Sequence, residues 1–120
     1  MPIPPNKNFG EALREVRMAK NISLRKFAKA VEVSPTYLSQ VEQENVQPPT
    51  ADRVKRMAEE LGENPDEWIA LAGRVPEDLP KIIQVQAAAV PDLLRAVEGM
   101  TADQIRKLRE AAERLKKKGK

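Results

Sequence analysis

The sequence has 120 residues, enough for one ordinary domain with an appendage or for two very small domains. It contains neither cysteine nor histidine, which excludes disulfides, thiolate or imidazole metal sites, and Ser-His or Cys-His catalysis. We therefore expect no enzyme, no metal site and no cofactor. The net charge is only +3, so the distribution of charge is more informative than its total.

Basic residues gather near the N-terminus. Between Lys7 and Lys29 only two acids, Glu11 and Glu15, accompany seven basic residues, which are Lys7, Arg14, Arg17, Lys20, Arg25, Lys26 and Lys29. A field this uneven favours a polyanionic partner on one side of the molecule. The alternative is a basic helical face that is merely solvated.

No apolar run approaches the length needed to span a bilayer, and no charged-then-apolar leader follows Met1. We expect a cytoplasmic protein without a membrane partner.

The chain begins with a proline-rich stretch. Residues 1–8 lack apolar periodicity and predict a flexible N-terminal arm. The next apolar residues recur at helical spacing and predict an amphipathic helix that ends near Asn21, with an inward face of Phe9, Ala12, Leu13 and Val16.

The segment from Ser23 to Glu42 predicts two short helices joined by a tight turn. Ser23 can cap the first of them because its side-chain oxygen can accept from a free amide of the first turn. The inward face of this helix is predicted to consist of Leu24, Phe27, Ala28 and Val31.

The second of these helices begins at a cap followed by a proline. Ser34 is the cap, and Pro35 occupies the first helical position, where a missing N–H costs nothing. Leu38 and Val41 point inward. The outer face then carries hydrogen-bonding side chains without an acid, namely Thr36, Tyr37, Gln40 and Gln43. Such a surface suits base edges in a major groove.

Two further helices follow a loop that contains paired prolines. Thr50 is the predicted cap of the first, while Asn64 and Pro65 open the second and Gly73 ends it. Five helices with no alternating strand pattern predict an all-α domain over residues 9–74.

Residues 75–120 differ in character, because helical segments there are interrupted by prolines. Thr101 and Gln104 form a capping box, and an apolar stripe follows at steps of three and four residues. Two heptads are too short to be stable alone, so the stripe must pack on the preceding helices or on a second copy of the chain. We predict a small helical dimerisation tail whose contact residues are Ile82, Ile83, Leu93, Leu94, Ile105, Leu108 and Leu115.

From Phe9 to Gly73 the sequence resembles the lambda-repressor-like, Xre-type helix-turn-helix family. The most specific motifs are Leu24-x-x-Phe27-Ala28, Val33-Ser34-x-x-x-Leu38-Ser39-x-Val41-Glu42 and Pro48-Pro49-x-x-x-x-Val54. The tail looks like the short helical dimerisation tails of some family members.

The resemblance implies a five-helix DNA-binding domain. In the family, the helix matching the one after Ser23 crosses the phosphate backbone, and the helix matching the one from Pro35 lies in the major groove. By position, Pro35, Thr36 and Gln40 match the base-contacting places, with Tyr37 beside them, and Ser23 and Arg25 match the start of the phosphate-contacting helix.

The sequence departs from the family pattern at three places. Glu32 and Glu44 stand where glycine is often found, and a left-handed non-glycine residue costs on the order of 1–2 kcal/mol. We expect Asn45 to take over the left-handed cap after the third helix. Leu24 replaces a glutamine that commonly braces a phosphate and a base-reading side chain, so the sequence preference should differ from that of the phage repressors.

Several side chains have a functional and a structural interpretation. Gln40 could pair with the N6 and N7 edge of an adenine or be a solvated helix residue, and Thr36 could contact a thymine methyl or serve only as a first-turn residue. Tyr37 could reach a phosphate or pack at the rim of the core. Phosphate contact and plain solvation compete for the exposed cations Arg25, Lys26 and Lys29.

Two residues are predicted to be structural. Trp68 has the spacing of a core residue beside Ile69 and Leu71, and Glu42 is expected to pair or cap inside the domain.

These observations predict a sequence-specific transcriptional regulator that binds double-stranded DNA as a homodimer. We expect a repressor that reads an inverted repeat, because one helix contacts few base pairs and two half-sites supply the missing specificity. The alternative is an antitoxin or adaptor whose tail binds a toxin or a protease and which autoregulates its own operon.

Overall fold

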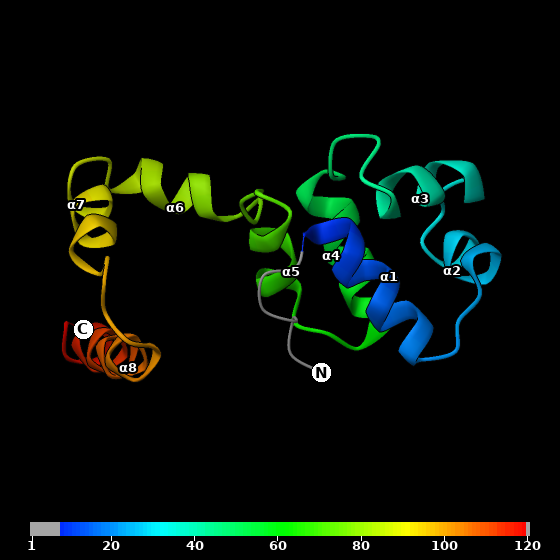
Figure 1. Ribbon diagram of the computed structural model, residues 1–120. Helices are drawn as coiled ribbons and strands as arrows, with labels where there is room; N and C mark the ends of the chain where they lie inside the picture. Colours follow the sequence, from blue (N-terminus) through cyan, green and yellow to red (C-terminus); the bar gives the residue numbers. More distant parts are fainter. Residues whose placement is uncertain (1–7, 120) are drawn as a thin grey trace. The chain divides into compact units, whose positions relative to one another are not determined.

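The computed structural model describes residues 8–119, and over these residues the regular secondary structure consists of α-helices, without a strand (Figure 1). The predicted all-α fold class is therefore confirmed. The helices are α1 (Phe9–Ala19), α2 (Leu24–Ala30), α3 (Pro35–Glu42), α4 (Ala51–Leu61), α5 (Pro65–Leu71), α6 (Leu79–Val85), α7 (Ala89–Ala96) and α8 (Ala102–Lys118).

The chain divides into two compact units, one that ends at Pro80 and one that starts at Lys81. The first unit contains α1 to α5, which are the five helices expected for the DNA-binding domain. Of the predicted N-terminal arm, only Asn8 lies within the described residues.

Side-chain caps start three helices of the first unit. The Oγ of Ser23 accepts from the N–H of Lys26 at 3.1 Å, and the Oγ of Ser34 accepts from the N–H of Tyr37 at 3.0 Å. Asn64 does the same for α5. Thr50 precedes α4 as predicted, but its side chain makes no capping hydrogen bond. These caps set where α2, α3 and α5 begin.

Glu44, not Asn45, adopts the left-handed conformation after α3, with φ of 62°, so the predicted transfer to Asn45 is wrong. The reason is the pairing of the last carbonyls. The N–H of Glu44 reaches the carbonyl of Val41 and the N–H of Asn45 reaches that of Gln40, which is the Schellman arrangement with Glu44 in the left-handed place. Glu32 does the same after α2, with φ of 60°.

One core holds α1 to α5 together. Phe27, Leu13, Leu38 and Trp68 are fully buried in it, and the Phe9 and Trp68 rings meet edge to face with centroids 6.0 Å apart. The core assignment of Trp68 is confirmed. The other buried apolar residues are Ala12, Val16, Ala28, Val31, Val41, Val54, Met57, Ala58, Leu61, Ile69 and Ala72.

The second unit contains α7 and α8, and α6 begins two residues before it. The predicted capping box is present, since the Oγ1 of Thr101 accepts from the N–H of Gln104 while the Oε1 of Gln104 accepts from the N–H of Thr101. None of the three helices buries a residue. Among the described residues, no helix is both long and apolar enough to cross a bilayer.

Candidate nucleic-acid interface

The outward face of α3 is available for contact. Leu38 and Val41 are buried on its inner side, while Pro35 and Thr36 are exposed at its start. Gln40 is half-buried one turn further on, and its side-chain amide forms no hydrogen bond with any of residues 8–119. Its donor and its acceptor are both free, which a bidentate contact with a base edge requires.

Tyr37 borders this face and is partly committed to the fold. Its ring is half-buried and packs against the core, which agrees with the structural interpretation for the ring. A tyrosine can nevertheless bury its ring and keep its hydroxyl at the surface.

The cations of α2 lie on the surface beside the turn. Arg25, Lys26 and Lys29 are exposed, and none of them forms an ion pair with a described residue. Ser23 is exposed too, but its oxygen already accepts the capping hydrogen bond from Lys26. Its hydroxyl can still donate one hydrogen bond to a phosphate.

A buried ion pair joins α1 to α3. The structural role of Glu42 was predicted from the sequence, whereas that of Arg17 was not. The Nε and Nη2 of Arg17 donate to the two carboxylate oxygens of Glu42 at 2.7 and 2.9 Å, and its Nη1 donates to the carbonyl of Ile22 at 2.7 Å. Arg17 is only 8% exposed and Glu42 only 7%. The structural role of Glu42 is confirmed.

Arg17 is therefore not available to a polyanionic partner, although its charge was counted in the basic cluster between Lys7 and Lys29. The hydrogen bonds to Glu42 raise the pKa of Arg17 above its ordinary value, against the opposing effect of burial. The signal was present in the spacing, because Arg17 follows Leu13 by four residues and Glu42 follows Leu38 by four. Each charge thus lies on the inner face of its own helix, one turn after a buried leucine.

A depression between α1, α2 and α3 opens beside this pair. It encloses about 390 Å³, and we call it the α1/α3 depression. Gln43 and Ser39 form its α3 side, and the Nε2 of Gln43 donates to the Oγ of Ser39 at 2.8 Å. The remaining lining residues are Arg14, Arg17, Leu24 and Glu42.

Two other arginines hold the loops around α3 and α4. Arg56 donates to the carbonyl of Ala30 at 3.2 Å and pairs with the carboxylate of Glu32 at 3.2 Å. Arg74 donates to the carbonyls of Pro48 and Pro49 at 2.6 and 3.1 Å. The exposed Arg56–Glu32 pair contributes little energy, but the backbone contacts help to position the connections on both sides of α3.

The predicted dimerisation residues remain largely uncovered. Five of them are at least 44% exposed, which are Ile82, Leu93, Leu94, Ile105 and Leu115, whereas Ile83 and Leu108 are half-buried. Val85, which was not predicted, is 78% exposed. The structure brings none of these residues into a core.

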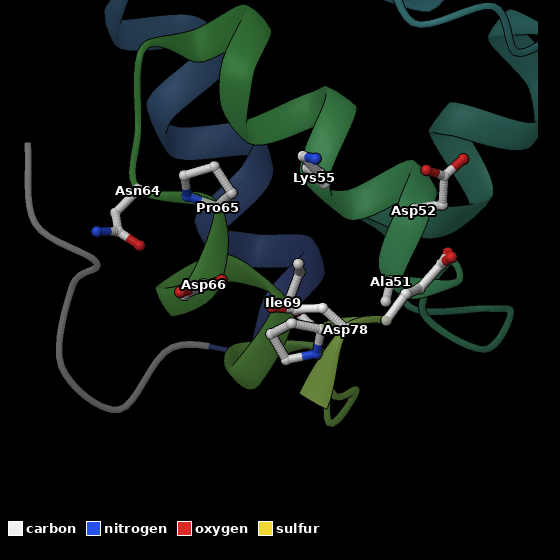
Figure 2. Close-up of a pocket in the computed structure, with 10 residues that line it drawn as sticks. Ala51, Asp52, Lys55, Asn64, Pro65, Asp66, Ile69 and Asp78 are labelled. Atoms are coloured by element: carbon white, nitrogen blue, oxygen red, sulfur yellow. The ribbon is translucent and has the colours of Figure 1, made fainter. Parts of the chain in front are cut away.

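A second depression, of about 510 Å³, lies on α4, α5 and the segment after α5 (Figure 2). Lys55 and four acids line it around an apolar floor that includes Ile69, and the acids are Asp52, Asp66, Glu77 and Asp78. Within residues 8–119 no group of three or more acids has the geometry to hold a metal ion. The depression contains none of the residues predicted to contact DNA.

Comparison with known proteins finds one matching family model and several similar solved structures. Residues 13–68 match a family model described as helix-turn-helix. A crystal structure of the clp gene regulator ClgR from Corynebacterium glutamicum is 30% identical over 81% of this chain and 95% of that chain, with a TM-score of 0.49. A second ClgR structure is 31% identical over 54% of this chain and 83% of that chain, with a TM-score of 0.47.

The SinR–SinI protein complex is a more distant match, at 17% identity over 91% of this chain and 98% of that chain, with a TM-score of 0.48. No curated protein matches the sequence significantly.

Proposed function

Because the chain belongs to the lambda-repressor-like, Xre class of helix-turn-helix DNA-binding transcription regulators, we propose that it is a dimeric repressor that reads an inverted repeat through α3. Its place of action is the cytoplasm. The observation that carries this proposal is the amide of Gln40 on the outward face of α3, which has no partner among residues 8–119, together with the exposed and unpaired cations of α2.

Within this proposal α3 contacts the bases and α2 contacts the sugar-phosphate backbone of the DNA. Pro35 and Thr36 approach the groove at the N-terminus of α3, Gln40 pairs with a base edge, and Tyr37 contacts the strand beside them. Ser23, Arg25, Lys26 and Lys29 contact phosphates, which set the register of α3 but carry no sequence information.

In this proposal the tail joins two copies of the chain, so that the dimer can bind two half-sites. Its apolar side chains are exposed in the second unit, and pairing two copies of the chain through them would remove this surface from water. A dimer then presents two α3 helices to half-sites about one DNA turn apart. The contact residues are Ile82, Ile83, Leu93, Leu94, Ile105, Leu108 and Leu115.

Selection of bound sequences from a random DNA pool by the purified protein tests the proposal, because the consensus and the half-site spacing emerge together.

Gln40→Ala should then weaken specific binding by about 1–3 kcal/mol and relax one base position in each half-site. Arg25→Ala should weaken binding to all sequences alike and reduce the salt slope by about one unit per half-site. A uniform loss from both variants would show that α3 is not the reading helix.

The second candidate function is that of an antitoxin or adaptor, whose tail binds a toxin or a protease. The same exposed apolar residues favour it, because a heterologous partner would cover them equally well. Sedimentation of the purified chain separates the two candidates. A self-folded dimer supports the repressor, while a monomer whose tail orders only with a partner supports the adaptor.

A further inference from the structure

Arg14 is the exposed cation of the α1/α3 depression. Each side-chain nitrogen of Arg17, one turn later, already donates to the carboxylate of Glu42 or to the carbonyl of Ile22. Arg14 itself is exposed and forms no ion pair or side-chain hydrogen bond with a described residue. Of the two guanidinium groups in the depression, only that of Arg14 is free to hold a ligand.

The other polar groups of the α1/α3 depression offer hydrogens. Gln43 gives one N–H to Ser39 and its Oε1 accepts from the Nδ2 of Asn45 at 3.3 Å, which leaves its second Nε2 hydrogen. Ser39 accepts from Gln43 and keeps its own hydroxyl proton. The one carboxylate of the depression, Glu42, is already paired with Arg17. The unused groups are therefore donors, which suits an anionic acceptor.

The position of these donors fits a DNA strand. A helix with its side chains is about 10–12 Å across and the major groove is about 12 Å wide, so a helix in the groove has a phosphate wall along each flank. Ser39 and Gln43 form one flank of α3, and they line the same depression as Leu24 and Arg14. A strand passing along this flank brings a phosphate to Arg14.

We propose that Arg14 is a further phosphate-contacting residue, and that Gln43 and Ser39 share its phosphate from the α3 side. The inference rests on the proposed function, since it takes α3 to lie in the groove. It assigns a specific phosphate contact to α1, whereas the contacts named from the sequence lie on α2 and α3. It also explains how the strand is held beside Leu24, whose side chain offers no hydrogen bond.

Salt titration of a fluorescent operator tests this inference with four variants of the full chain. Arg14→Ala should weaken operator and random DNA by the same several-fold factor and reduce the salt slope by about one unit per half-site, because each protomer releases one fewer counterion. Arg14→Lys should keep the slope and lose only part of the affinity, since lysine retains the charge but not the planar fork. Arg25→Ala is the positive reference.

Arg114→Ala is the matched control. Arg114 is an exposed arginine on α8, so its substitution changes the net charge equally but lies in the unit without proposed DNA contacts. It should leave the slope unchanged. Circular dichroism melts check that all four variants fold.

Phosphate ethylation gives the independent readout. One ethylated phosphate in each half-site should hinder binding of the unsubstituted protein and no longer hinder Arg14→Ala. If Arg14→Ala behaves like Arg114→Ala while Arg25→Ala lowers the slope, the role of Arg14 is refuted and the proposed function stands. If the unsubstituted protein shows no salt-dependent binding to DNA, the proposed function itself fails.

Discussion

Arg17 and Glu42 show how two charged side chains can belong to the core. Three hydrogen bonds from the guanidinium connect α1 to α3 and to the connection before α2. A buried pair of this kind gains little over an apolar pair of the same size, but loss of one partner leaves the other charge buried and uncompensated. The pair therefore acts mainly to hold α3 in one position against α1.

We predict that Glu42→Leu or Arg17→Met alone lowers the free energy of unfolding by about 3–5 kcal/mol. The double variant Arg17→Met with Glu42→Leu should lose much less, because it leaves no unpaired charge. Urea unfolding of the single and double variants measures the coupling between the two sites. Additive losses would contradict the assignment of the pair as a buried unit.

The raised pKa of Arg17 has a definite consequence for pH. A folded-state pKa above the ordinary value means that the stabilisation is fully present below that ordinary value and is lost only at higher, strongly alkaline pH. The chain also contains no histidine or cysteine. We predict no steep change in stability or operator affinity between about pH 6 and pH 8 at fixed salt. Paired titrations at these two pH values check it, and a steep response would reveal a strongly shifted carboxylate, lysine or terminal amine.

At the scale of elements, α1 and α3 approach one another closely at Gly10. A Cβ built on Gly10 would lie 2.4 Å from the carbonyl oxygen of Val41 and 2.9 Å from that of Glu42. Both neighbours are backbone atoms and cannot rotate away. Glycine is thus required at this position of α1 by the close packing of the C-terminal end of α3.

Gly10→Ala should lower the free energy of unfolding by about 1–3 kcal/mol, because the clash outweighs the gain of up to about 1 kcal/mol in helix propensity. It should also weaken specific DNA binding, since α3 must shift. Gly62→Ala provides the comparison, because Gly62 has φ of 71° and no neighbouring atom within 4 Å of the added Cβ. That variant should lose stability through backbone strain alone and keep its affinity for DNA. Equal affinities for both variants would mean that α1 does not position α3.

At the scale of the whole molecule, the two units have different sources of stability. Every buried apolar residue that forms the core lies between Phe9 and Ala72. The helices after Pro80 bury nothing, and helices of this length are marginal in water without packing. We therefore expect the second unit to gain stability from a partner surface, which the proposed function assigns to a second copy of the chain.

Removal of residues 81–120 should leave a folded, cooperative and monomeric first unit. Its affinity for a single half-site should be nearly unchanged, whereas its affinity for the two-half-site operator should fall toward that for a single half-site, because the second half-site is no longer tethered. Sedimentation and operator titration of the truncated chain measure both effects. A truncated protein that still sediments as a dimer would refute the role of the tail.

The sequence by itself determined the helices of the first unit and where they begin. Ser23, Ser34 and Asn64 cap α2, α3 and α5, and the apolar spacing identified the core face of each helix of the first unit, because capping and periodicity depend on residues within a few positions of one another. The outward position of Thr36 and the half-exposed position of Gln40 follow from the same local spacing.

Only the tertiary structure decided which partners those helices bring together. The pairing of Arg17 with Glu42 spans 25 residues, and the approach of Gly10 to α3 spans more than 30, so no local pattern specifies them. The same contacts removed Arg17 from the basic cluster and left Arg14 free beside Ser39 and Gln43. The physical reason is that burial and ion pairing depend on distances between elements, whereas sequence periodicity reports only the face of each element on which a residue lies.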